Sequence, residues 1–131
     1  MMMRRLLVAS LIAVATVAAG GAAWAHHSFS ATYDESKTQK IEGKLVQFLF
    51  RNPHSYVHVE APDAAGKVQR YSVEWGGAGQ LGGQGISRET LKPGDQVIVS
   101  GAPGRNPVEY RLRMNTIVRP LDGWRWGGTV D

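Results

Sequence analysis

Residues 54–75 read HSYVHVEAPDAAGKVQRYSVEW, and this stretch decides the fold class. Its two arms, 54–60 and 67–75, alternate polar and apolar residues as half-buried strands do. Residues 62–66 lie between them and contain proline, aspartate and glycine, which are typical of a turn. The stretch therefore predicts a β-hairpin of two antiparallel strands.

Three further strands are expected around this hairpin. Residues 39–50 are rich in partly alternating apolar residues and include Gly43, which predicts a long strand bent or bulged at the glycine. Residues 96–101 and 108–118 predict two more strands. Five strands in this order, with a long bent first strand, match a small all-β barrel of the OB type. An open β-sandwich is the alternative arrangement.

The segment between the third and fourth strands is rich in glycine. Residues 76–85 contain six glycines and only one bulky apolar residue, Leu81, which indicates a loop. Residues 87–91 predict a short helical turn capped by Ser87, and the lysine, proline, glycine and aspartate of residues 92–95 indicate a sharp turn. We therefore expect one short helical turn between strands 3 and 4.

The first 25 residues carry the features of a secretory signal in the required order. Arg4 and Arg5 give a positive start, residues 6–19 are apolar except for Ser10 and Thr16, and residues 23–25 read Ala-Trp-Ala, a signal peptidase site. The apolar run is shorter than the about 20 residues of a membrane-spanning helix. We expect a Sec-type signal peptide cleaved after Ala25, a periplasmic or secreted protein, and no membrane span after cleavage.

Cleavage leaves 106 residues, enough for one small domain. We expect an N-terminal arm over 26–38, the OB-like barrel over 39–120 and a tail rich in tryptophan and glycine over 121–131. These residues carry 13 basic and 11 acidic side chains, scattered rather than gathered in a run, so we expect no nucleic-acid partner. The absence of cysteine excludes disulfides and thiolate chemistry.

The four histidines of the chain fall into two pairs. His26 and His27 stand at the expected new N-terminus, and His54 and His58 lie on the second predicted strand. Because side chains alternate along a strand, His54 and His58 share one face with Tyr56. Their Cα atoms are about 13 Å apart on a regular strand. That spacing is wide for one metal ion, so only one of the two is expected to be a ligand.

The third predicted strand adds a carboxylate to the same face. Since Val73 and Trp75 belong to the core set, Glu74 faces the side of the histidines, near Tyr56 or His54. A carboxylate beside an imidazole serves as a metal ligand or as an outer group that fixes the imidazole tautomer. An ordinary salt bridge or polar surface has the same pattern.

A histidine at the N-terminus can chelate a metal through its α-amine and its ring nitrogen. With His26 in that position, one imidazole from His54 or His58 completes a three-nitrogen set that suits Cu(II), with His27 or Glu74 nearby. The amine of His26 with the amide and ring of His27 is a second, local chelate. A polar arm with ordinary surface histidines is the third alternative. Copper is the one cofactor that this pattern predicts.

The tail places Trp124 and Trp126 on either side of an arginine. Their rings either cap one end of the barrel or form a stacking surface for a sugar, a base or a peptide. If the rings form a stacking surface, the protein is a non-enzymatic OB-type module that binds a periplasmic partner protein or a glycan. No catalytic residues are predicted, because Ser28 beside His27 and the glycine-rich residues 76–85 match no catalytic or phosphate-binding pattern.

Four motifs along the chain are similar to those of one known family. HHSFSA at residues 26–31, NPH at 52–54, EWG at 74–76 and LKPGDQV at 91–97 resemble an uncharacterised family of small secreted bacterial proteins. The resemblance covers nearly all of the chain after the signal. It implies a domain of unknown function with a signal peptide and a β-rich fold. The glycine-expanded segment after Glu74 departs from the family's pattern.

Overall fold

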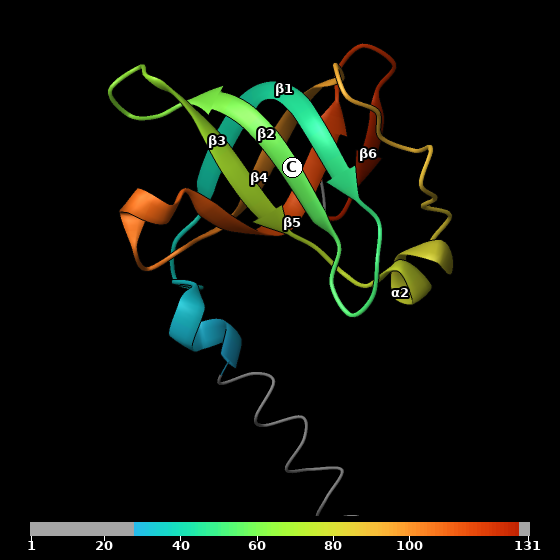
Figure 1. Cartoon of the computed structure of the whole chain (residues 1–131), viewed down its shortest axis with the longest axis horizontal. Coiled ribbons are helices and arrows are strands. Elements are labelled where there is room, and N and C mark those ends of the chain that lie inside the picture. Colours follow the sequence, from blue (N-terminus) through green and yellow to red (C-terminus); the bar gives the residue numbers. More distant parts are fainter. Residues whose placement is uncertain (1–27, 129–131) are drawn as a thin grey trace, which may run out of the picture. The chain divides into compact units, whose positions relative to one another are not determined.

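The hairpin predicted from residues 54–75 forms two neighbouring strands of a barrel (Figure 1). β2 (Tyr56–Pro62) and β3 (Val68–Glu74) pair antiparallel, with Val57 opposite Val73 and Val59 opposite Tyr71. These four side chains are at most 2% exposed. The predicted alternation of core and outer residues is confirmed in this hairpin.

The computed structural model describes residues 28–128. The chain divides into two units after Thr32. In the first unit, residues 28–32 form a short helical segment. The second unit contains every strand of the sheet described below. Among the described residues, no helix has the length and apolar character needed to cross a bilayer.

Three more strands close the barrel. β1 (Gln39–Leu49) pairs with β4 (Gln96–Pro103) through its first half and with β2 through its second half. β4 pairs with β5 (Arg111–Arg119), and β5 lies parallel to β3. The order β1-β2-β3-β5-β4 therefore closes on itself, and Figure 1 shows β1 curving around the barrel. The predicted five-stranded all-β barrel is confirmed.

The end of the chain departs from the predicted strand count. A sixth strand, β6 (Trp124–Trp126), pairs with β5 beside the barrel. β5 also begins later than predicted, because η1 (Pro107–Glu109) forms a 3-10 turn and Tyr110 takes a left-handed conformation before it. The proline at the start of η1 has no N–H for a sheet hydrogen bond.

The helical turn between β3 and β4 lies earlier than predicted. α2 (Ala78–Gly82) forms inside the glycine-rich segment, whereas Ser87 to Thr90 makes only a hydrogen-bonded turn. Leu81 explains the difference, because it is completely buried and its N–H donates to the Gly77 carbonyl at 2.9 Å. Burial of one leucine thus overrides the low helix propensity of its glycine neighbours.

The barrel encloses one apolar core. Alternate residues of each barrel strand point inward, and the connection between β3 and β4 adds four further side chains, Trp75, Leu81, Ile86 and Leu91. The main contributors from the strands are Ile41, Leu45, Val57, Val59, Tyr71, Val73, Val97, Val99, Leu112, Met114 and Ile117. This packing holds the barrel together without any disulfide.

Candidate functional site

A buried carboxylate is the centre of the candidate site. Glu74, the last residue of β3, lies opposite Tyr56 of β2 and Arg113 of β5. Its neighbours Val73 and Trp75 point into the core, so strand alternation turns Glu74 toward the outer face of the barrel. A carboxylate on an outer face is normally exposed to solvent. Glu74 is nevertheless only 8% exposed. Burial requires that its oxygens find strong partners.

The two oxygens of Glu74 have separate partners. The hydroxyl of Tyr33 donates a hydrogen bond to Oε2, and Nδ1 of His54 contacts Oε1. His54 is 38% exposed at its side chain, while the carboxylate beneath it is nearly covered. Glu74 therefore connects a buried phenol to an imidazole that reaches the surface, and the expected proximity of Glu74 and His54 is confirmed.

Tyr33 is the residue of the candidate site that the sequence did not predict. It comes from the segment expected to be a polar arm, but it is 1% exposed and forms a β-bridge with Gly104. The Asp34 N–H donates to the Pro103 carbonyl at 2.9 Å, and the Arg111 guanidinium lies 5.9 Å from the Tyr33 ring centroid. The one sign of its burial in the sequence was a large aromatic residue in an otherwise polar segment.

The environment of Glu74 keeps the neighbouring phenols protonated. Burial, together with the hydrogen bond to Glu74, raises the pKa of Tyr33 far above its usual range. Burial and the charge of Glu74 also raise the pKa of Tyr56. Tyr56 is half-buried, and the Arg51 guanidinium lies 5.3 Å from its ring centroid. Both hydroxyls therefore act as hydrogen-bond donors toward the carboxylate rather than as bases.

The backbone on each side of His54 is held by hydrogen bonds. The Ser55 N–H donates to the Gly76 carbonyl at 3.0 Å, and the Trp75 N–H donates to the Ser55 carbonyl at 2.8 Å. The Ser55 hydroxyl donates to the Arg51 carbonyl at 3.2 Å. These contacts attach the loop before β2 to the end of β3, which carries Glu74. The imidazole and the carboxylate are therefore positioned by the same local framework.

His58 lies in a different environment from His54. It is paired with Ser72 across the hairpin, and its Nδ1 lies 3.2 Å from the Arg70 guanidinium. Burial, followed by the charges of Arg70 and Arg51, lowers the pKa of His58. His54 lies in the loop before β2 rather than on the predicted strand, so the two histidines have different surroundings. A cationic neighbour makes His58 a poor ligand for a metal ion.

Replacing Arg70 with glutamine is expected to raise the pKa of His58, because one cationic neighbour is lost while the burial remains. In the native protein the folded pKa lies below that of the unfolded chain, so the contribution of His58 to stability is present at about pH 7 and lost toward about pH 5. The Arg70→Gln variant should lose less stability over that interval. NMR titration and urea unfolding measure both effects, and an unaltered His58 pKa would contradict this reading.

Four site residues predicted from the sequence remain: His26, His27, Trp124 and Trp126. The two histidines lie outside the described residues. Trp126 packs edge-on against Trp75, with ring centroids 5.0 Å apart, and its indole N–H donates to Gln84 Oε1 at 2.7 Å. Trp124 lies under the Arg119 guanidinium, 5.4 Å from its ring centroid. Both indoles pack on the barrel, the arrangement expected of a cap.

The described residues alone do not complete a metal site. Within residues 28–128, no group of three or more His, Asp or Glu side chains is arranged to hold a metal ion. His54 with Glu74 instead forms a two-residue unit in which the carboxylate fixes the imidazole. Such a pair can supply one nitrogen ligand to a metal ion or one oriented base to a catalytic site. In either case, other residues must supply the remaining ligands or catalytic groups.

Comparison with known proteins places the chain in a family but assigns it no activity. No curated protein matches the chain at a significant level. A family described as a family of unknown function, DUF6152, matches residues 13–112. That match spans all of the first four barrel strands and both Glu74 and His54. The expected resemblance to an uncharacterised family is confirmed, and the chain belongs to the DUF6152 family.

Proposed function

We propose that this protein is an exported copper-binding protein in which His54 supplies an imidazole ligand and His26 supplies its α-amine and ring. The observation that carries the proposal is the contact between His54 Nδ1 and the buried carboxylate of Glu74. Export follows from the signal features of residues 1–25. Cleavage after Ala25 creates the amine that makes His26 a chelator.

The contact with Glu74 suits His54 to metal binding. A carboxylate that accepts the Nδ1 proton leaves the lone pair of the imidazole on Nε2, the atom that can then bind a metal ion. Tyr33 holds the other oxygen of Glu74, so the carboxylate cannot turn away without breaking a buried hydrogen bond. The ring of His54 is therefore oriented before any metal arrives, which lowers the cost of binding.

The electrostatic surroundings favour His54 over His58. The Arg70 guanidinium contacts the ring of His58, and its charge opposes a bound cation as it opposes a bound proton. Glu74 places a carboxylate beside His54 instead. An amine and two imidazoles then give three nitrogen ligands, a set for which Cu(II) has the highest affinity among the divalent first-row metals.

Titration with Cu(II) tests the proposal on protein whose mass shows that it begins at His26. We expect one bound Cu(II) per chain, with nitrogen hyperfine structure in the EPR spectrum. One extra residue before His26 should weaken binding strongly, because the α-amine is displaced. Glu74→Gln should weaken binding by about 10- to 100-fold, the effect of losing an outer partner of a ligating histidine.

His54→Gln and His58→Gln form a matched pair of variants. Loss of affinity in His54→Gln, with native affinity in His58→Gln, supports the proposed ligand set. Native affinity in both variants, together with loss on extension of the N-terminus, assigns copper to the local chelate of His26 and His27 and contradicts the proposal. No binding at all contradicts metal binding altogether.

A further inference from the structure

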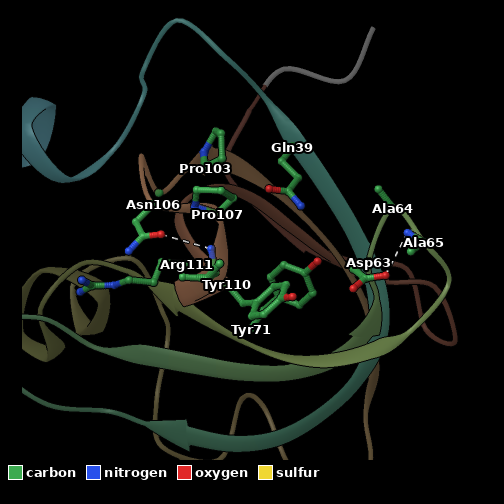
Figure 2. A pocket seen from close by; sticks show the side chains of 12 residues that line it. Gln39, Asp63, Ala64, Ala65, Tyr71, Pro103, Asn106, Pro107, Tyr110 and Arg111 are labelled. Carbon is green, nitrogen blue, oxygen red and sulfur yellow. Dashed lines mark hydrogen bonds between the residues drawn. The ribbon is translucent and has the colours of Figure 1, made fainter.

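A cavity of about 370 Å³ opens at the end of the barrel where β4 ends and β5 begins (Figure 2). Its walls come from the β2–β3 turn, Tyr71 of β3, the first residue of β1 and the connection through η1. This volume falls in the range of small-molecule sites. The cavity contains neither His54 nor Glu74, so it is distinct from the proposed copper site.

Tyr110 forms the aromatic wall of this cavity, and the ring of Tyr71, which is only 2% exposed, packs against it. The rings of Tyr71 and Tyr110 meet edge to face with centroids 5.4 Å apart, and Figure 2 shows them side by side. Tyr110 has a φ of 47°, a left-handed conformation that costs on the order of 1 kcal/mol or more for a residue other than glycine. Its carbonyl accepts the Ser72 N–H at 2.9 Å, which anchors that conformation.

Apolar side chains line the cavity. Val108 is 73% exposed although it belongs to the lining. Pro103 and Pro107 add apolar surface next to each other in Figure 2. Large apolar groups left in water around one hollow are a mark of a binding surface.

The polar groups of the cavity favour an uncharged ligand. The side chain of Gln39 hydrogen-bonds to Tyr71, and the rest of the half-buried Gln39 amide can pair with a ligand hydroxyl. Asp63 is held ionised, because a hydrogen bond from Gln69 and those from the turn N–H groups lower its pKa. The Arg111 guanidinium points away from Tyr71 and Tyr110 in Figure 2, and it pairs with the Glu109 carboxylate at 3.6 Å.

From this lining we infer that the cavity binds a neutral sugar ring of a glycan. A pyranose has an apolar C–H face that packs on tyrosine rings and hydroxyls that pair with amide and phenol groups. The carboxylate of Asp63 repels phosphates and acidic sugars. The Arg111 side chain, which also lines the cavity, opposes a cationic ligand in the same way. A neutral saccharide satisfies both conditions.

Binding is tested by NMR titration of the full chain with maltotriose, cellotriose and triacetylchitotriose. We expect at least one of them to shift the amide signals of Gln39, Tyr71 and Tyr110 without shifting that of His54. Tyr110→Asn removes the ring while keeping a residue that tolerates the left-handed conformation. This variant should bind about tenfold more weakly or worse, since a stacking ring is lost.

Leu121→Ser is the matched control, because Leu121 is 94% exposed and lies outside the cavity lining. It should bind the sugar like the native protein. If Tyr110→Asn does not fold, Gln39→Ala provides the same test from another wall. The inference is overturned if no neutral sugar shifts these signals, or if an acidic sugar or a proline-rich peptide binds the cavity and the neutral sugars do not.

Discussion

Replacement of Tyr33 with alanine is expected to destabilise the barrel domain by about 3–5 kcal/mol, the cost of truncating a fully buried aromatic side chain. Tyr33 is 1% exposed, and its hydroxyl is a partner of the buried carboxylate of Glu74. The alanine variant therefore loses packing and also leaves Glu74 with one oxygen unpaired. Urea unfolding followed by tryptophan fluorescence measures the loss.

Tyr33→Phe separates the two contributions. It keeps the ring and removes the hydrogen bond to Glu74, so it should cost about 1–3 kcal/mol, the range for a hydrogen bond to a charged group. A loss below about 1 kcal/mol in Tyr33→Ala would mean that the segment before β1 does not belong to the core. The phenylalanine variant should also loosen His54, which shares the carboxylate.

Gly43→Ala is expected to destabilise the barrel by about 3 kcal/mol or more, at the upper end of overpacking effects. A Cβ at this position would lie 2.0 Å from the Glu60 carbonyl oxygen and 2.9 Å from the Ala61 Cβ. The nearest atom belongs to the backbone of β2 and cannot rotate away. β1 and β2 would have to separate where they pair, and thermal unfolding would show the change.

Gly82→Ala is the matched control for this prediction. Gly82 lies in α2, and an added Cβ there meets nothing within 4 Å. Alanine favours the helix and restricts the unfolded chain, so this variant should be neutral or stabilised by up to about 1 kcal/mol. Equal stability of the Gly43 and Gly82 variants would contradict the close approach of β1 and β2.

The strands of the barrel were predictable because their signal is local. Alternation along residues 54–75 selects the buried face of β2 and β3, and the opposition of Tyr56 and Glu74 follows from a short hairpin turn. The long β1 was recognisable from its length and its glycine. The irregularity in its pairing with β2, however, lies between Leu45 and Gln47, after Gly43. Pairing with two neighbours sets that position, and no local pattern encodes it.

Elements that depend on a single buried side chain were not predictable in the same way. α2 forms around Leu81 in a segment whose glycines indicate a loop, because only the finished barrel offers that leucine a buried site. β6 forms because Trp126 packs against Trp75. In both cases tertiary burial outweighs local propensity.

The fold class, the inward faces of the strands and a place for Glu74 near Tyr56 or His54 all follow from local patterns in the sequence. The burial of Glu74 does not, because the residue that covers it, Tyr33, precedes it by 41 positions. The same holds for the cavity, whose walls come from β1, β3, the β2–β3 turn and the connection through η1. Contacts between residues so far apart depend on how the barrel closes, and strand periodicity carries no information about closure.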